Sequence, residues 1–169
     1  MIGQKAWQGS FDGFCGIYSA VHALCHDSEN YETVSGTAFF SILRALEDAQ
    51  KLTARKISGP NCGFYDLEIA SAINAISARS RRSKLAVAFR DARFLGSALQ
   101  GKADEIFNHN GSLIIQENGP KHWIAALGRK RDGNYECLDP AVKNPRLTRQ
   151  RISWDQGVLI GPQQWISSI

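Results

Sequence analysis

Apolar residues recur at helical spacing through the first half of the chain. The pattern predicts a helix from about Cys15 to Cys25, a second from roughly Ser35 to Gln50, and a third that Asp66 can cap. Ser35-Gly36-Thr37 is the start signal for the second of these. The apolar positions are Ile17, Val21 and Leu24, then Phe39, Phe40, Ile42, Leu43 and Leu46, then Leu67, Ile69, Ala70, Ile73 and Ile76. The first half is therefore predicted to be mainly helical.

The second half changes to short apolar runs separated by turn residues. One further helix is predicted from Phe94 to Phe107. Arg131-Asp132-Gly133-Asn134 predicts a hairpin turn between two of the strands. Helices followed by an antiparallel sheet indicate an α+β fold of two facing layers, in a single domain over residues 1–169. The predicted strands are Leu85–Phe89, Ser112–Gln116, His122–Leu127, Tyr135–Leu138 and Val158–Ile160.

Composition fits one ordinary domain, with 43% apolar residues in a chain of 169. The apolar stretches are far shorter than the roughly 20 residues of a membrane span, and no secretory apolar region follows Met1. We therefore expect no membrane contact and a cytoplasmic protein, with signal-less export left open. In that compartment the four cysteines are expected to be free thiols. The oligomeric state does not follow from the sequence.

Two clusters suggest binding functions that the rest of the sequence does not favour. The net charge is +4, and Arg79–Lys84 holds much of it, but no zinc-finger spacing or aromatic-interleaved basic strand argues for nucleic acid as a partner. His22 and His26 lie four residues apart and could bind a metal together with Cys25 or Cys15. No Glu in the protease pattern and no Cys-x-x-Cys accompany them. We expect a solvated basic connection, a structural histidine pair, and no metal or cofactor.

Cys15 is the strongest candidate for a reactive group. A loop containing Gly9 and Gly13 delivers it to the start of the first predicted helix. There, unpaired backbone N–H groups and the positive end of the helix dipole stabilise an anion, which favours a thiolate. Gly13 and Gly16 allow close backbone approach, so we interpret Cys15 as a nucleophile rather than as a small buried apolar residue. The other cysteines lack such a setting and are interpreted as structural thiols: Cys25, Cys62 and Cys137.

A base and an orienting acid follow in later strands. His122 stands at the head of one predicted strand and Asp139 at the end of the next, so a hairpin would bring them together. A cysteine nucleophile needs such a base and a third group that holds the base in the correct tautomer. The backbone N–H of Cys15 and the amide of Gln8 would donate to an oxyanion. Residues lining the pocket are expected on loops such as Ser58–Phe64 and Gln116–Pro120.

These motifs resemble those of the papain-like cysteine peptidases. Gln8, Cys15-Gly16, His122-Trp123 and Leu138-Asp139-Pro140 match the family's glutamine, cysteine, histidine and asparagine or aspartate in type and order. The pattern is most similar to that of the small bacterial peptidases that process bacteriocin leaders, in which Asp-x-x-Cys-Gly and a late Asp-Pro are typical. The Cys-Gly-Ser-Cys-Trp signature of the plant and lysosomal enzymes is absent.

The resemblance implies a helical half, with the nucleophile on its central helix, packed against a C-terminal antiparallel sheet. It implies a thiol hydrolase for a peptide or isopeptide bond, in which Cys15 attacks, His122 moves the proton, Asp139 orients His122 and Gln8 binds the oxyanion. The same triad also serves side-chain deamidases, transglutaminase-like acyltransferases and cell-wall amidases. A catalytically silent peptide-binding module is a further alternative, against which the retention of all four residue types argues.

Overall fold

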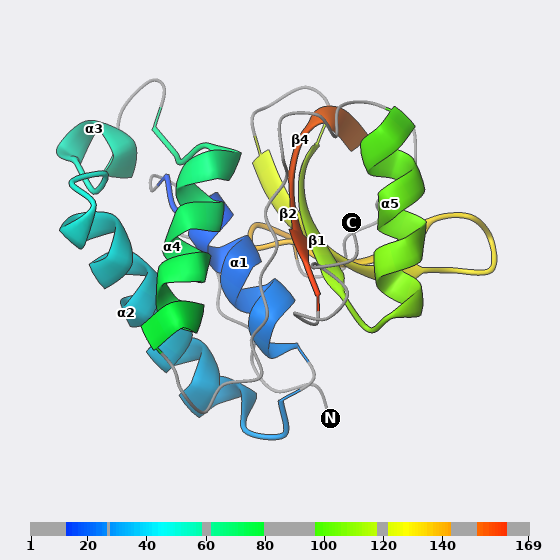
Figure 1. The fold of residues 1–169 in the computed structure, drawn as a ribbon, viewed down its shortest axis with the longest axis horizontal. Coiled ribbons are helices and arrows are strands. Elements are labelled where there is room, and N and C mark those ends of the chain that lie inside the picture. The colour runs from blue at the N-terminus through cyan, green and yellow to red at the C-terminus, as the bar shows by residue number, and fades with distance from the viewer. Residues whose placement is uncertain are drawn as a thin grey trace.

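The computed structural model describes residues 13–26, 28–58, 62–79, 97–117, 122–142 and 152–161. All the described helices precede the described strands along the chain, which confirms the α+β class (Figure 1). Among the described helices, none combines the length and the apolar character that crossing a membrane requires. The elements are α1 (Cys15–Cys25), α2 (Tyr31–Asp48), α3 (Ala54–Ile57), α4 (Asp66–Arg79), α5 (Ser97–Asn108), β1 (Ser112–Glu117), β2 (His122–Arg129), β3 (Tyr135–Leu138) and β4 (Ile152–Ile160).

The strands form one antiparallel sheet in the order β3-β2-β1-β4, and helices cover both of its faces. Figure 1 shows α1, α2 and α4 on one side of the sheet and α5 on the other. Alternate residues of the strands supply two separate cores: Ile114 and Ala125 face the α1 side, whereas Leu113 and Ile124 face α5. The expectation of two layers was wrong, because α5 buries Ala103 and Ile106 on the far face.

The predicted hairpin between the histidine and aspartate strands is confirmed. β2 pairs with β3 in the register Ala125↔Leu138, and the turn closes through a hydrogen bond from Lys130 N to Asn134 O of 2.8 Å. Gly133 takes φ +84° in this turn, a left-handed conformation that glycine adopts without strain. The hairpin therefore brings the start of β2 close to the residue that follows β3.

Helix α2 begins at Tyr31, four residues before the predicted start at Ser35. The expected start signal lies inside the helix, where the hydroxyls of Ser35 and Thr37 donate to the carbonyls of Glu32 and Thr33, both at 3.1 Å. Hydroxyl side chains satisfied in this way are tolerated within a helix and do not start one. The helix also ends at Asp48, before the predicted Gln50.

Other boundaries moved for local reasons. Asp66, the predicted cap of helix α4, is its first residue and accepts the Leu67 N–H at 2.9 Å. Glu68 also caps the helix by accepting the Tyr65 N–H at 2.9 Å. Strand β4 starts at Ile152, six residues before the predicted Val158, because a bulge interrupts its apolar pattern. The short helix α3 was not predicted. The predicted strand Leu85–Phe89 and most of the basic Arg79–Lys84 segment lie outside the described residues.

Candidate active site

Cys15 is the first residue of α1, and it is 7% exposed. Tyr18 N is the first helical amide to reach a carbonyl, that of Phe14 at 2.9 Å, so the N–H groups of the first turn have no acceptor within the helix. Among the described residues no side chain caps this helix, and its first turn contains no acidic residue. The thiol therefore lies at the positive end of the helix dipole, beside N–H groups that have no acceptor within the helix.

Two glycines let the backbone approach closely on either side of Cys15. A Cβ at Gly13 would lie 2.3 Å from Lys56 O and 2.6 Å from Gly63 N. A Cβ at Gly16 would lie 2.6 Å from Cδ1 of Ile69 and 3.2 Å from Cδ1 of Trp123. Any side chain at these positions would displace α1 from the sheet or from the loop beside it. The prediction that these glycines serve close approach is confirmed.

His122 and Asp139 form a short hydrogen bond, with 2.7 Å between Nε2 and Oδ1. His122 is the first residue of β2, and Asp139 directly follows β3. The same Oδ1 accepts the Ala141 N–H at 2.7 Å, which fixes the carboxylate independently of the histidine. Asp139 is 7% exposed, so its carboxylate is shielded from water. The geometry is that of a histidine held in one orientation by a carboxylate.

The Cys15 side chain is the second group that acts on the His122 ring, because its interaction with the ring raises the pKa of His122. Because Nε2 is engaged by Asp139, Nδ1 is the nitrogen left for the thiol. Burial by itself lowers the pKa of His122, but the hydrogen bonds to Asp139 and Cys15 outweigh it and raise the pKa to about 9. Burial likewise acts to raise the pKa of Asp139, yet the hydrogen bonds from His122 and Ala141 lower it overall. The ring is therefore an imidazolium at neutral pH.

Trp123 connects these two halves of the site. Its carbonyl accepts the Ser19 hydroxyl of α1 at 2.8 Å, and its ring lies against Gly16. A second bond from the Ser112 hydroxyl to the carbonyl of Ala23 holds the other end of α1 to the sheet at 3.0 Å. Trp123 is 2% exposed, so its ring is part of the core. These contacts fix the distance between the head of α1 and the head of β2.

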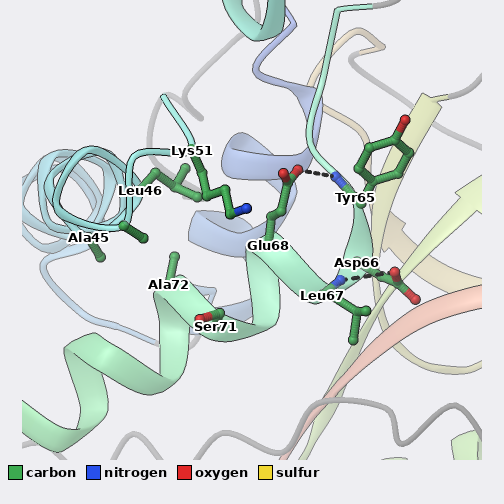
Figure 2. Close-up of a pocket in the computed structure, with 10 residues that line it drawn as sticks. Ala45, Leu46, Lys51, Tyr65, Asp66, Leu67, Glu68, Ser71 and Ala72 are labelled. Carbon is green, nitrogen blue, oxygen red and sulfur yellow. Dashed lines mark hydrogen bonds between the residues drawn. The ribbon is translucent and has the colours of Figure 1, made fainter. Parts of the chain in front are cut away.

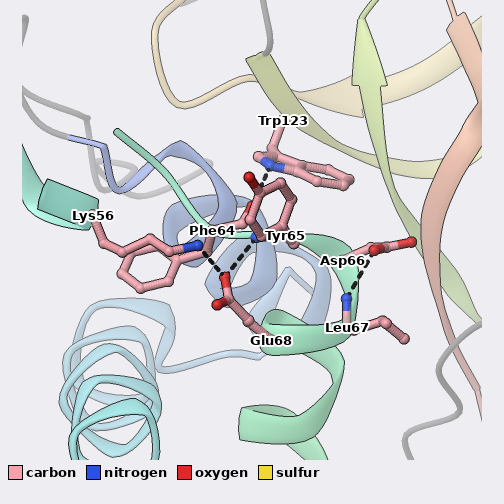
Figure 3. A network of polar contacts seen from close by, with 7 residues as sticks. All are labelled: Lys56, Phe64, Tyr65, Asp66, Leu67, Glu68 and Trp123. Atoms are coloured by element: carbon pink, nitrogen blue, oxygen red, sulfur yellow. Dashed lines mark hydrogen bonds and ion pairs between the residues drawn. The ribbon is translucent and has the colours of Figure 1, made fainter. Parts of the chain in front are cut away.

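The loop before α4 forms a wall beside Cys15, and Figure 3 shows what anchors it. The indole N–H of Trp123 donates to the carbonyl of Phe64 at 3.0 Å. Glu68 accepts both the Tyr65 N–H at 2.9 Å and the ammonium of Lys56 at 2.6 Å. That ammonium also lies 4.1 Å from the centre of the Tyr65 ring. Backbone, ion pair and ring contacts together hold this wall in one position.

Cys15 opens onto a cavity of about 200 Å³. Its lining comes from α3, the loop before α4, and strands β1, β2 and β4. The predicted contributions of the 58–64 loop and of Gln116 are confirmed by Cys62, Gly63, Phe64 and Gln116. Arg55 and Gln156 also line the cavity and were not predicted. Gly157 inside an apolar strand pattern was the available signal for Gln156, because such a glycine often marks a bulge.

A larger cavity of about 540 Å³ lies between the end of α2 and the start of α4 (Figure 2). Its walls include Leu46, Lys51, Leu67 and Ser71, and it contains no nucleophilic thiol and no histidine. Tyr65 lines both cavities. Of these two cavities, only the smaller is lined by Cys15.

The remaining predicted residues divide into three groups. Gln8, the candidate oxyanion donor, lies outside the described residues. His22 is buried and its Nδ1 lies 2.7 Å from the Tyr31 hydroxyl, while Nδ1 of His26 lies 3.2 Å from the carbonyl of Ala23, so both rings have local structural partners. All four cysteines are free thiols, and burial raises the pKa of Cys25 to about 11.

Stability is expected to fall as the pH rises past the pKa of His122. The pKa increases from 6.5 to about 9 on folding, so this group stabilises the fold fully below the lower value and loses its contribution as the pH passes the upper one. We expect a loss of about 2 to 3 kcal/mol between roughly pH 6 and pH 10. Urea unfolding at both pH values should show a decrease that is larger by this amount in the wild type than in His122→Gln, because the raised pKa of Cys25 lowers the stability of both proteins at the higher pH. The exposed His109→Gln is the control, and an unchanged pH dependence in His122→Gln would contradict the assignment.

Comparison with known proteins identifies no family for this chain: no protein-family model matches the sequence, and no curated protein matches it either.

Proposed function

We propose that this protein is a papain-like cysteine hydrolase that cleaves an amide bond of a peptide or protein. The observation that carries the proposal is the convergence on one imidazole ring of the Asp139 carboxylate, at 2.7 Å, and of the Cys15 thiol at a helix start. The shared order of Gln8, Cys15, His122 and Asp139 with that superfamily supports it further. The same resemblance would imply a bacterial origin and a role in processing secreted peptides.

The first half of the proposed reaction forms a thioester. The Cys15 sulfur attacks the carbonyl carbon of the substrate, and the electron pair of the carbonyl moves to its oxygen. The backbone N–H of Cys15 and the amide of Gln8 would donate to this oxyanion. His122 transfers its Nδ1 proton to the amine nitrogen as the C–N bond breaks. The amine leaves, and the acyl group stays on Cys15.

The second half releases the acyl group. His122, now neutral, accepts a proton from water as the water oxygen attacks the thioester carbonyl. The carboxylic acid leaves, and the Cys15 sulfur again faces a protonated ring. Asp139 keeps the imidazole in the orientation that both proton transfers need. The anchored loop at Phe64 and Tyr65 shields one side of the thioester from solvent.

The reaction is tested by mixing the protein with a synthetic peptide library and identifying products by mass. We expect new peptide termini, and after rapid acid quench a thioester adduct on Cys15. Cys15→Ser should lose both, whereas Cys62→Ser, which changes another thiol of the same cavity, should keep them. Conversion of glutamine to glutamate without chain cleavage would identify a side-chain deamidase instead. Products that persist in Cys15→Ser would refute the proposed mechanism.

A further inference from the structure

Strand β4 carries a large bulge beside the Cys15 cavity. Ile115 of β1 pairs with Gly157, but the next residue, Gln116, pairs with Ser153. Residues 154–156 therefore have no partners of their own on β1 between these two pairs. Bulges of this kind redirect side chains and are common next to active sites.

The bulge sends neighbouring side chains to opposite faces of the sheet. Trp154 packs on the α5 side, where its ring centre lies 6.1 Å from that of Tyr135. Gln156 lines the cavity on the other side, together with Cys15 and Trp123. An uninterrupted strand would place residues 154 and 156 on the same face, because side chains alternate with a period of two. The bulge therefore places the Gln156 amide in the cavity onto which Cys15 opens.

The carbonyl oxygen of this amide is buried and accepts no hydrogen bond from the described residues. A buried acceptor without a donor costs about 1 to 3 kcal/mol, so native structures keep few of them. Polar side chains with donors line the same cavity, on Arg55, Tyr65 and Gln116, and none of them reaches this oxygen. Because Oε1 of Gln156 lies in the same cavity as the Cys15 thiol, a hydrogen-bond donor of the substrate could satisfy it.

We propose that Gln156 is a substrate-binding residue whose Oε1 accepts a hydrogen bond from a backbone N–H of the substrate, next to the carbonyl that Cys15 attacks. The substrate class is then a peptide chain with an unsubstituted amide at that position, and the inference rests on the proposed function. A backbone N–H is present whatever the side chain, so this contact orients the scissile bond without selecting a sequence. The cavity of about 200 Å³ suits a short stretch of an extended chain, since whole drug-sized ligands occupy about 300 to 1,000 Å³.

The test compares reagents that differ in one N–H group. Acetyl-Gly-Ala chloromethyl ketone alkylates a thiolate at its methylene carbon with loss of chloride, and two derivatives carry a methyl group on one or the other backbone nitrogen. Labelling rates at Cys15 are read by peptide mass mapping. For the wild type, one of the two methylations should slow labelling about tenfold, the size expected for one lost hydrogen bond to a buried acceptor.

Variants of Gln156 assign that effect. Gln156→Met keeps the length of the side chain and removes its acceptor, so it should slow the parent reagent about tenfold and abolish the difference between the methylated and unmethylated reagents. Gln156→Glu keeps an acceptor and should preserve the difference. Gln100→Met, which removes an amide of α5 on the other side of the sheet (Figure 1), is the control and should behave as the wild type. If Gln156→Met does not fold, Gln156→Asn, which withdraws the amide by one methylene, replaces it.

Methyl methanethiolsulfonate separates the two proposals, because it reacts with a thiolate and carries no N–H. It should label Cys15 at the same rate in the wild type and in the uncharged variants Gln156→Met and Gln156→Asn. Failure to label Cys15 ahead of the other thiols would overturn the proposed function. Preferential labelling of Cys15, combined with a methylation effect that is absent in the wild type or unchanged in Gln156→Met, would overturn the role of Gln156 alone.

Discussion

Replacing Gly13 with alanine is expected to lower the free energy of unfolding by about 3 kcal/mol or more. The added Cβ would lie 2.3 Å from Lys56 O and 2.6 Å from Gly63 N, and both are backbone atoms that cannot rotate away. Relief of this clash would break two backbone hydrogen bonds: Gly13 N to Ile57 O at 2.7 Å, and Gly63 N to Lys56 O at 2.8 Å. Urea unfolding of the purified variant measures the loss.

Gly36 provides the matched control for this substitution. It lies inside α2, and a Cβ there meets no atom within 4 Å. Gly36→Ala should therefore stabilise the protein by about 0.5 to 1 kcal/mol through helix propensity. Each substitution adds one methyl group. A loss of stability from Gly13→Ala together with a gain from Gly36→Ala would therefore place the effect at the junction of α1 with the loops beside it. Equal effects from the two substitutions would show that the close approach at Gly13 does not constrain this junction.

Replacing His122 with alanine is expected to slow alkylation of Cys15 by iodoacetamide about 30- to 100-fold near pH 6. Iodoacetamide reacts with the thiolate form of a cysteine, and a neighbouring imidazolium stabilises that anion relative to the neutral thiol. Because the pKa of His122 is about 9, the ring carries its positive charge under these conditions. A stabilised thiolate is also a weaker nucleophile, so the alkylation rate rises by less than the fraction of thiolate does. Intact mass against time gives the rate.

The control for this variant is His26→Ala, which removes another histidine near α1. Nδ1 of His26 lies near the carbonyl of Ala23 at the far end of the helix, so this substitution should leave the alkylation rate of Cys15 unchanged. Comparable slowing in both variants would indicate a general effect on folding. An unchanged rate in His122→Ala would mean that the imidazole does not activate the thiol.

The sequence predicted where the candidate residues lie in the fold better than it predicted their surroundings. Cys15, His122 and Asp139 carry local signals that need no tertiary information: a glycine-flanked helix start, and two strands joined by an Asp-Gly turn. Short hairpins fix which strand ends meet, so the neighbourhood of His122 and Asp139 followed from the chain order alone. The close backbone approach at Gly13 and Gly16 was also predictable from the local sequence, because a glycine has no side chain to fill space beside the backbone.

What the sequence did not predict depends on contacts between distant segments. Helix α5 lies on the far face of the sheet because its apolar residues pack with strand residues of that face, as Ile106 does with Leu113. The ion pair between Lys56 and Glu68 joins residues twelve positions apart. Gln156 reaches the cavity only because β4 bulges against β1, and register shifts leave little trace in a single apolar pattern.

The most direct test of the account is the selectivity of iodoacetamide labelling near pH 6, read by mass mapping of all four cysteines in the folded wild-type protein. We predict that Cys15 is modified first although it is only 7% exposed, while Cys62, the more exposed thiol of the same cavity, lags behind. Cys25 and Cys137 are buried and should remain unmodified. Labelling ordered by exposure, with Cys62 ahead of Cys15, would show that Cys15, His122 and Asp139 do not form an activated nucleophile and would contradict the account.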